Sequence, residues 1–185
     1  AECKVLITDL AFSDTIRDTL KRCSVKPLTI DYDDPEFSQP GKPLSEFDYE
    51  ELLSQGDPDF TWLMPNDEWD AISVNYTSGT TGDPKGVVYH HRGASLLVQS
   101  SIITTSLAKH SVYLWTLPMF HCNGWCFPWA MVAVSGTQVC LREVRADAIW
   151  AALKQHQVTL LCGAPVVMST MLATDPSERP ELPDI

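Results

Sequence analysis

Residues 71–87 constrain the fold most, because a strand-like segment there runs directly into a loop of small polar residues. Ala71 to Tyr76 is rich in β-branched and aromatic residues, which predicts a strand. Thr77 to Gly82 contains only Thr, Ser and Gly, and Asp-Pro-Lys-Gly follows. Glycines that adopt positive φ let backbone N–H groups approach a phosphate closely. The sequence therefore predicts a strand that ends at an anion-binding loop.

Three kinds of group in this loop are candidate phosphate ligands. They are the hydroxyls of Thr77, Ser78, Thr80 and Thr81, the backbone at Gly79 and Gly82, and the cation of Lys85. A Ser/Thr/Gly tract alone is usually a flexible linker. Here the strand before it and the Gly-Asp-Pro-Lys-Gly segment at its end favour a phosphate loop. It differs from the P-loop of nucleotide hydrolases, because Pro84 precedes the lysine and Gly86 follows it.

A second motif spans residues 117–129 and places His121, Asn123 and Trp125 among Phe, Trp and Met residues. It begins where a predicted strand, Val112 to Leu117, ends, and ligands collect at the carboxyl ends of strands in α/β sheets. A mostly apolar segment with a few polar groups is typical of a small-ligand pocket. A lone histidine is otherwise more often a core or solvent-exposed residue. The position of His121, 35 residues beyond Gly86 and after one helix and one strand, favours a site.

The two motifs together resemble the adenylate-forming (AMP-dependent synthetase/ligase) superfamily. In that family the Ser/Thr/Gly loop grips the β- and γ-phosphates of ATP, and the histidine of Pro-Met-Phe-His borders the acyl group and the α-phosphate. The run from Phe120 to Trp129 is similar to an acyl-CoA synthetase branch that includes medium-chain fatty acyl-CoA ligases and methylmercaptopropionate-CoA ligases. The resemblance covers residues from Lys4 to about Leu172.

This resemblance implies an acid–thiol ligase that uses ATP, Mg²⁺ and coenzyme A. A short- or medium-chain carboxylic acid attacks the α-phosphorus, and the thiol of coenzyme A then displaces AMP from the acyl-adenylate. Lys85 and His121 are the implied catalytic residues. The implied phosphate ligands are Thr77, Ser78, Gly79, Thr80, Thr81, Gly82 and Lys85. His121, Asn123 and Trp125 are the implied lining of the acyl pocket, and no protein metal site is expected.

Two alternatives stay open, an amino-acid adenylation domain and a non-catalytic nucleotide-binding homologue. Residues 111–141 contain no carboxylate, so this stretch offers no countercharge for the ammonium group of an amino acid. The intact loop with Lys85 argues against a degenerate homologue.

The order of predicted elements indicates an α/β fold with a mostly parallel sheet flanked by helices. We expect strands at 4–9, 25–30, 71–76, 87–89, 112–117, 137–141 and 158–161, and helices at 13–22, 45–54, 93–107, 125–134, 147–155 and 166–173. Ser13 and Ser45 are the expected N-caps of the first two helices. Residues 1–185 are expected to form part of a large N-terminal domain that is inactive alone. The later motifs and the C-terminal domain of the family are expected outside this chain.

The net charge of −11 arises in residues 1–70, which hold 17 acidic and 6 basic residues, whereas residues 71–185 hold 7 of each. The phosphate loop thus lies in the neutral part, and no basic patch indicates a nucleic acid as partner.

Residues 111–141 have no charged side chain, but Pro118 and Gly124 interrupt them, so their apolar pieces are too short to span a membrane. They are expected inside a sheet.

The six cysteines are expected to be reduced core residues of a cytoplasmic protein. His121, Cys122 and Cys126 include no Cys-x-x-Cys pair, which argues against zinc. The sequence leaves open whether the protein forms a homo-oligomer.

Overall fold

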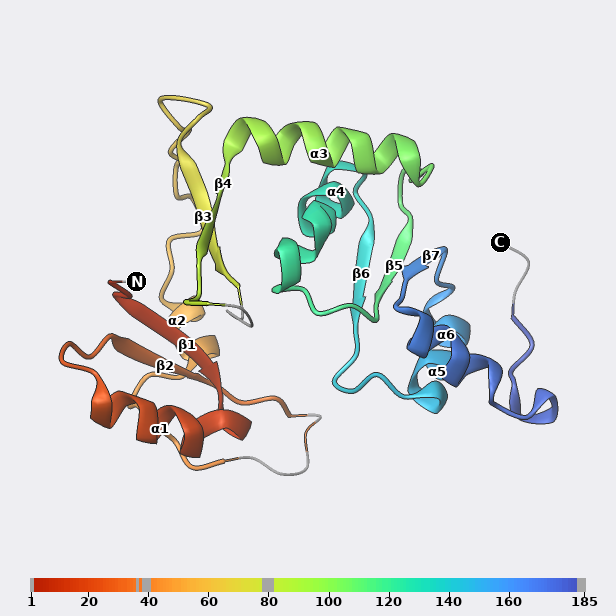
Figure 1. Cartoon of the computed structure of the whole chain (residues 1–185), viewed down its shortest axis with the longest axis horizontal. Helices are drawn as coiled ribbons and strands as arrows, with labels where there is room; N and C mark the ends of the chain where they lie inside the picture. Colours follow the sequence, from red (N-terminus) through yellow and green to blue (C-terminus); the bar gives the residue numbers. More distant parts are fainter. Residues whose placement is uncertain (1, 36, 38–40, 78–81, 183–185) are drawn as a thin grey trace. The chain divides into compact units, whose positions relative to one another are not determined.

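The computed structural model describes residues 2–35, 37, 41–77 and 82–182. The chain divides into two compact units, one that ends at Leu63 and one that begins at Met64. The predicted α/β class is confirmed in each unit, as the helices and strands in Figure 1 show.

The first unit is built around a parallel strand pair. Its elements are β1 (Val5–Asp9), η1 (Leu10–Phe12), α1 (Ser13–Arg22), β2 (Leu28–Tyr32) and α2 (Tyr49–Ser54). Val5 lies opposite Leu28 and Asp9 opposite Tyr32 in a parallel register. A parallel pair needs a crossover, and η1 and α1 supply it. The predicted strand, helix and strand order is therefore confirmed.

The N-caps predicted for this unit are wrong. Ser13 is already helical, and its hydroxyl accepts a hydrogen bond from the backbone N–H of Lys42 at 3.1 Å. A single 3₁₀ turn precedes α1, and the carboxylate of Asp9 caps that turn instead. Helix α2 begins at Tyr49 rather than at Ser45, because the Asp48 carboxylate accepts the N–H groups of its first turn. A charged acceptor makes the stronger hydrogen bond, which favours Asp over Ser as the cap.

The second unit contains a hairpin and a three-stranded parallel sheet. Its elements are β3 (Ala71–Tyr76), β4 (Gly86–His90), α3 (His91–Thr104), β5 (Val112–Trp115), η2 (His121–Cys126), α4 (Phe127–Ala133), β6 (Thr137–Cys140), α5 (Ala146–His156), β7 (Leu160–Cys162), α6 (Pro165–Leu172) and η3 (Pro176–Glu178). β5 lies between β6 and β7 and is parallel to both (Figure 1). β3 and β4 pair with each other in antiparallel fashion. The parallel sheet was predicted, and the antiparallel hairpin beside it was not.

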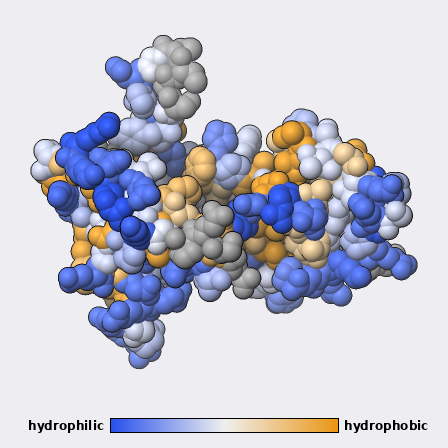
Figure 2. Space-filling view, turned by 90° about the horizontal axis from the view of Figure 1, so that it is seen from below, coloured by the Kyte–Doolittle hydropathy of each residue, from blue (hydrophilic) through white to orange (hydrophobic). Residues whose placement is uncertain are grey.

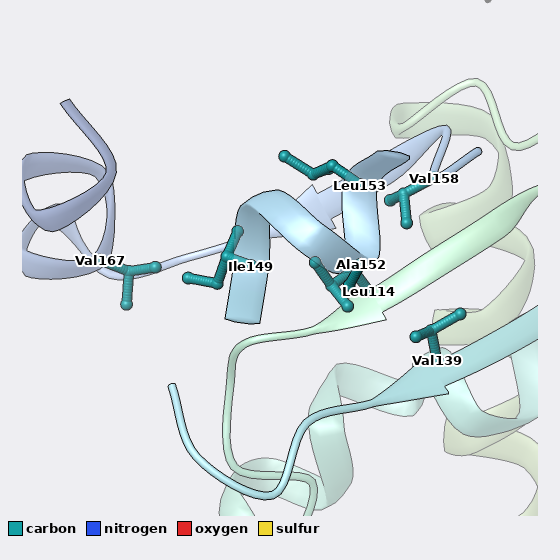
Figure 3. Packing of buried hydrophobic residues seen from close by; sticks show 7 residues of the cluster. All are labelled: Leu114, Val139, Ile149, Ala152, Leu153, Val158 and Val167. Carbon is teal, nitrogen blue, oxygen red and sulfur yellow. The ribbon is translucent and has the colours of Figure 1, made fainter. Parts of the chain in front are cut away.

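The core of this unit lies on both faces of β5. Leu114 packs with Ile149 and Val167, which come from α5 and α6 (Figure 3). On the opposite face, the Tyr113 ring stacks on Phe127 at the start of α4, with ring centroids 4.8 Å apart. Tyr113, Leu114 and Ile149 are fully buried. This burial confirms the interior position that the absence of charge predicted for this strand.

The prediction that the cysteines are core residues is wrong for most of them. Cys126 is buried and Cys162 is half-buried, while the other four, Cys3, Cys23, Cys122 and Cys140, are exposed. All six are free of disulfide bonds. Cys3 precedes β1, Cys23 follows α1, Cys122 lies in η2 and Cys140 ends β6, so none of the four lies inside a covered part of an element.

Apolar side chains also reach the surface in several patches (Figure 2). One of them is a face of the hairpin, where Val74, Tyr76 and Val88 are each more than half exposed. Despite these patches, none of the helices in the described residues has the length and hydropathy to cross a membrane.

Truncating the core of the second unit should destabilise it strongly. Ile149→Ala removes a side chain with 0% exposure, and the cavity should lower the free energy of unfolding by about 2–5 kcal/mol. Ile103→Ala, at a helical position that is 78% exposed, should change it by less than about 0.5 kcal/mol. Urea unfolding followed by circular dichroism measures both. Equal losses from the two variants would contradict this core.

Candidate functional site

The base of the predicted phosphate loop is closed by two hydrogen bonds between Thr77 and Lys85, one between backbone groups and one to the Thr77 side chain. Tyr76 lies opposite Gly86 in the antiparallel register of β3 and β4. One residue further, the N–H of Thr77 donates to the carbonyl of Lys85 at 2.9 Å, and the N–H of Lys85 donates to the Thr77 hydroxyl at 3.1 Å. Among the described residues, the hydroxyl hydrogen of Thr77 is not donated to another group, which suits contact with an anion. The hairpin thus holds both ends of the loop together.

Within the loop itself, Ser78, Gly79, Thr80 and Thr81 lie outside the described residues. Gly82 and Lys85 are both exposed. Among the described residues, no atom lies within 4 Å of the position where a Cβ of residue 82 would be. Lys85 forms no ion pair with the described residues. Its charge is therefore free to meet an anionic ligand.

The second motif forms a strained turn, η2, after the carboxyl end of β5. Cys122, Gly124, Trp125 and Cys126 have φ values of 49°, 54°, 56° and 61°. For a non-glycine residue this left-handed conformation costs roughly 1–2 kcal/mol. At residue 124 a Cβ would lie 2.6 Å from the Trp115 ring, so only glycine fits there. Strain of this kind concentrates at functional sites.

The predicted pocket residues differ in how the structure places them. His121 and Trp125 belong to the same turn and are both exposed. The side chain of Asn123 lies outside the described part of the chain. Their predicted role in binding an acyl group therefore stays a prediction.

A small cavity of about 230 Å³ lies beside this turn. It is formed by β4, the first turns of α3 and the end of η2, and its lining residues are Val88, Tyr89, His90, Gly93, Ala94, Leu97 and Cys126. Burial raises the pKa of the Cys126 thiol, which keeps it protonated and unreactive at neutral pH. Neither His121 nor Trp125 lines this cavity. It is mostly apolar, and Tyr89 and His90 supply its polar groups.

Among the described residues, a hydrogen bond joins the hairpin to the turn. The hydroxyl of Tyr89 on β4 donates to the carbonyl of Cys122 at 3.1 Å. Burial, with smaller contributions from Cys122 and Cys126, raises the pKa of Tyr89. The phenol therefore remains a protonated donor across the neutral range. This bond connects the segments that carry the two sequence motifs, which are distant along the chain.

Sequence reasoning missed two polar side chains of this site. Tyr89 lies opposite Ser73 in the hairpin, on the same face as Asn75. The Nδ2 atom of Asn75 is buried and has no hydrogen-bond partner among the described residues, which costs about 1–3 kcal/mol. Asn75 is therefore a further candidate for ligand contact. Strand alternation could have placed both residues on one face, but only with the hairpin register known.

The paired histidines were interpreted as a polar corner rather than as a base or a metal ligand. His90 ends β4, and its Nδ1 accepts the N–H of Gly93, so it caps α3. Its ring also packs on Trp69, with centroids 4.7 Å apart. Across the described residues, no group of three or more His, Cys, Asp or Glu side chains is placed to hold a metal ion.

Comparison with known proteins identifies the family of this chain. The AMP-binding enzyme family matches residues 1–183, so the chain belongs to this family. Among curated relatives, a 2-methylpropanoate–CoA ligase of Humulus lupulus is 44% identical over 186 residues, covering 97% of this chain and 33% of the relative. The peroxisomal acetate/butyrate–CoA ligase of Arabidopsis thaliana is 40% identical, covering 99% of this chain and 34% of the relative.

Solved structures share the fold at lower identity. The N-terminal domain of FACL13 from Mycobacterium tuberculosis has a TM-score of 0.76 at 22% identity, over 98% of this chain and 43% of that chain. The O-succinylbenzoate coenzyme A synthetase of Bacillus subtilis, solved with ATP and magnesium, has a TM-score of 0.68 at 20% identity, over 92% of this chain and 31% of that chain. The chain spans about a third of the length of the curated relatives named above.

The geometry of the turn predicts that Gly124 cannot be replaced. Gly124→Ala combines a left-handed φ with a clash against the Trp115 ring, so it should lower the free energy of unfolding by roughly 1–3 kcal/mol. Gly82→Ala, where no described atom lies within 4 Å of the added Cβ, should change it by less than about 0.5 kcal/mol. Urea unfolding of both variants gives the comparison. A Gly124→Ala protein as stable as the parent would contradict the described turn.

Proposed function

We propose that the chain is part of the large N-terminal domain of an AMP-forming acyl-CoA ligase that activates a short- or medium-chain carboxylic acid. The observation that carries this proposal is the bonding of the phosphate-loop hairpin to the turn of His121, through Tyr89 and the carbonyl of Cys122. One motif would hold the departing phosphates, and the other would hold the acid beside the α-phosphate. An enzyme that joins an acid to AMP needs both sites together.

In the first step the acid carboxylate attacks the α-phosphorus of ATP and pyrophosphate leaves. The charge that develops on pyrophosphate would be stabilised by the loop N–H groups, by the hydroxyls of Thr77, Ser78, Thr80 and Thr81, and by Lys85. The exposed and unpaired state of Lys85 among the described residues suits this role. Mg²⁺ would bind mainly to the phosphate oxygens, since this ion keeps most ligands from substrate and water.

His121 would border the acyl group and the α-phosphate, with Asn123 and Trp125 beside it. Its exposed position in the η2 turn leaves the imidazole able to meet a ligand. In the second step the thiol of coenzyme A would displace AMP and form the thioester.

The substrate class rests on two observations. Residues 111–141 carry no acidic side chain, so this segment suits a plain carboxylic acid better than an amino acid. The named relatives act, by their names, on 2-methylpropanoate and on acetate or butyrate, all short acids. Cytoplasmic location and self-association stay predictions, and one of these relatives is peroxisomal by name.

The direct test measures pyrophosphate release by the longer protein that contains this chain. ATP and Mg²⁺ are supplied with acetate, butyrate, 2-methylpropanoate, methylmercaptopropionate, octanoate, benzoate or amino acids, each with and without coenzyme A. Sustained turnover that needs coenzyme A and favours short or medium acids is the expected result. Release only with amino acids would favour an amino-acid adenylation domain. Nucleotide binding without release under any condition would favour a non-catalytic homologue.

Because the loop is proposed to bind the phosphates, we expect the positive charge of Lys85 to strengthen ATP binding. Lys85→Met should weaken ATP binding about tenfold or more, because one charge-assisted contact to the phosphates is lost. Lys109→Met removes another exposed lysine, outside both motifs, and should leave the dissociation constant within about twofold. Isothermal titration with ATP and Mg²⁺ measures both. Equal affinities of the Lys85→Met variant and the parent would argue against the phosphate role.

A further inference from the structure

We infer that Tyr89 is a positioning residue for the reaction proposed above. Its phenolic hydroxyl fastens the turn that carries His121 to the strand that leaves the phosphate loop. The inference rests on the proposed function for its kinetic consequence, but its structural part can be measured without any activity.

The turn needs a contact from outside, because its own conformation is unfavourable. Cys122, Trp125 and Cys126 all have positive φ values without being glycine. Residues with such unfavourable φ values keep their conformation only when contacts with the surrounding structure hold them there. The described hydrogen bonds within the segment are short-range ones, such as His121 N–H to the Pro118 carbonyl at 3.1 Å. They do not connect the turn to another element.

Tyr89 supplies that connection. Among the described hydrogen bonds, its bond to the Cys122 carbonyl links the turn backbone to a different element. The acceptor belongs to the first left-handed residue and lies directly beside His121 along the chain. Tightening or loosening this bond therefore acts on the residue next to the proposed catalytic histidine.

The other end of the connection lies close to the phosphate loop. β4 begins at Gly86, immediately after Lys85, and Tyr89 follows three residues later. Pairing with β3 and the bonds between Thr77 and Lys85 hold this strand in place. A short path thus runs from Lys85 along β4 to Tyr89 and across to Cys122, the residue after His121. We therefore expect the distance between the two proposed catalytic groups to depend on the Tyr89 hydroxyl.

The role belongs to the hydroxyl and can be separated from that of the ring. The ring lines the small cavity together with Cys126, and phenylalanine would preserve that wall. Tyr89→Phe therefore removes the donor while it leaves the packing in place. The raised pKa of Tyr89 agrees with a hydroxyl that keeps its proton and its donor function at neutral pH.

The kinetic test uses Tyr89→Phe in the longer protein, with rates expressed per active site by titration of bound acyl-adenylate. We expect kcat for acid-dependent pyrophosphate release to fall about tenfold, because small displacements of a catalytic group cost rate steeply. KM for ATP should stay within about twofold, since the loop and Lys85 are unchanged. A purely structural role would lower the fraction of active protein and leave kcat per active site as it was.

Tyr113→Phe is the matched control. It also removes a phenolic hydroxyl from the second unit, one that is buried and has no hydrogen-bond partner among the described residues. Its kcat per active site should equal that of the parent. If the rate of Tyr89→Phe also stays within twofold of the parent, or if both variants lose rate equally, the positioning role is overturned.

Hydrogen exchange provides a readout that needs no activity. In Tyr89→Phe, amides of a peptide that covers residues 122–127 should exchange at least tenfold faster than in the parent, and those of α5 should not change. If the amides of the turn exchange at the same rate in Tyr89→Phe and in the parent, the Tyr89 hydroxyl does not hold the turn. This conclusion is independent of whether the protein activates an acid. A parent protein that is inactive with every acid would refute the proposed function, while the exchange result would still decide the role of Tyr89.

Discussion

The pairing of Thr77 with Lys85 is the interaction on which the rest of the site depends. A loop of Gly, Ser and Thr has little structure of its own, and ordering each residue costs roughly 1–2 kcal/mol of backbone entropy. The backbone hydrogen bond from Thr77 to Lys85 extends the β3–β4 pairing by one residue, and the bond from the Lys85 N–H to the Thr77 hydroxyl closes the same position, so both ends of that loop are fixed. They also set where β4 starts, and therefore which face of the hairpin carries Tyr89. The antiparallel hairpin is thus a scaffold for anion binding and for the contact with the second motif.

The second motif is held from its other side by the core of the sheet. The Trp115 ring at the end of β5 lies so close to residue 124 that only glycine fits, and its Nε1 donates to Gln138 of β6 at 3.1 Å. Directly after the turn, Phe127 stacks on the buried Tyr113 ring. A strained turn between a rigid sheet and a rigid hairpin can keep one conformation, and this is the usual requirement for a catalytic group. The fold therefore stores strain where the proposed chemistry needs a fixed geometry.

Local pattern predicted the elements well, because hydrophobic periodicity reflects burial. Strand β3 matches its predicted bounds, and the charge-free residues 111–141 do contain the central strand β5. The N-cap of α2 was wrong because a carboxylate competed with the predicted serine for the same N–H groups. Tyr89 could not be found from the sequence, because its partner is a backbone carbonyl 33 residues away and carries no side-chain signature. The left-handed turn also could not be predicted. Glycine is the usual sequence sign of a positive φ, and three of the four positive-φ residues in this turn are not glycine.

A crystal structure of the longer protein with ATP and Mg²⁺ tests the central claim most directly. The account predicts that the β- and γ-phosphates contact the loop between Thr77 and Lys85, with the α-phosphate on the side of His121 and the Tyr89 bond to Cys122 intact. A nucleotide bound away from the loop, or a phosphate chain held there with His121 turned away from the α-phosphate, would contradict a single site built from the two motifs.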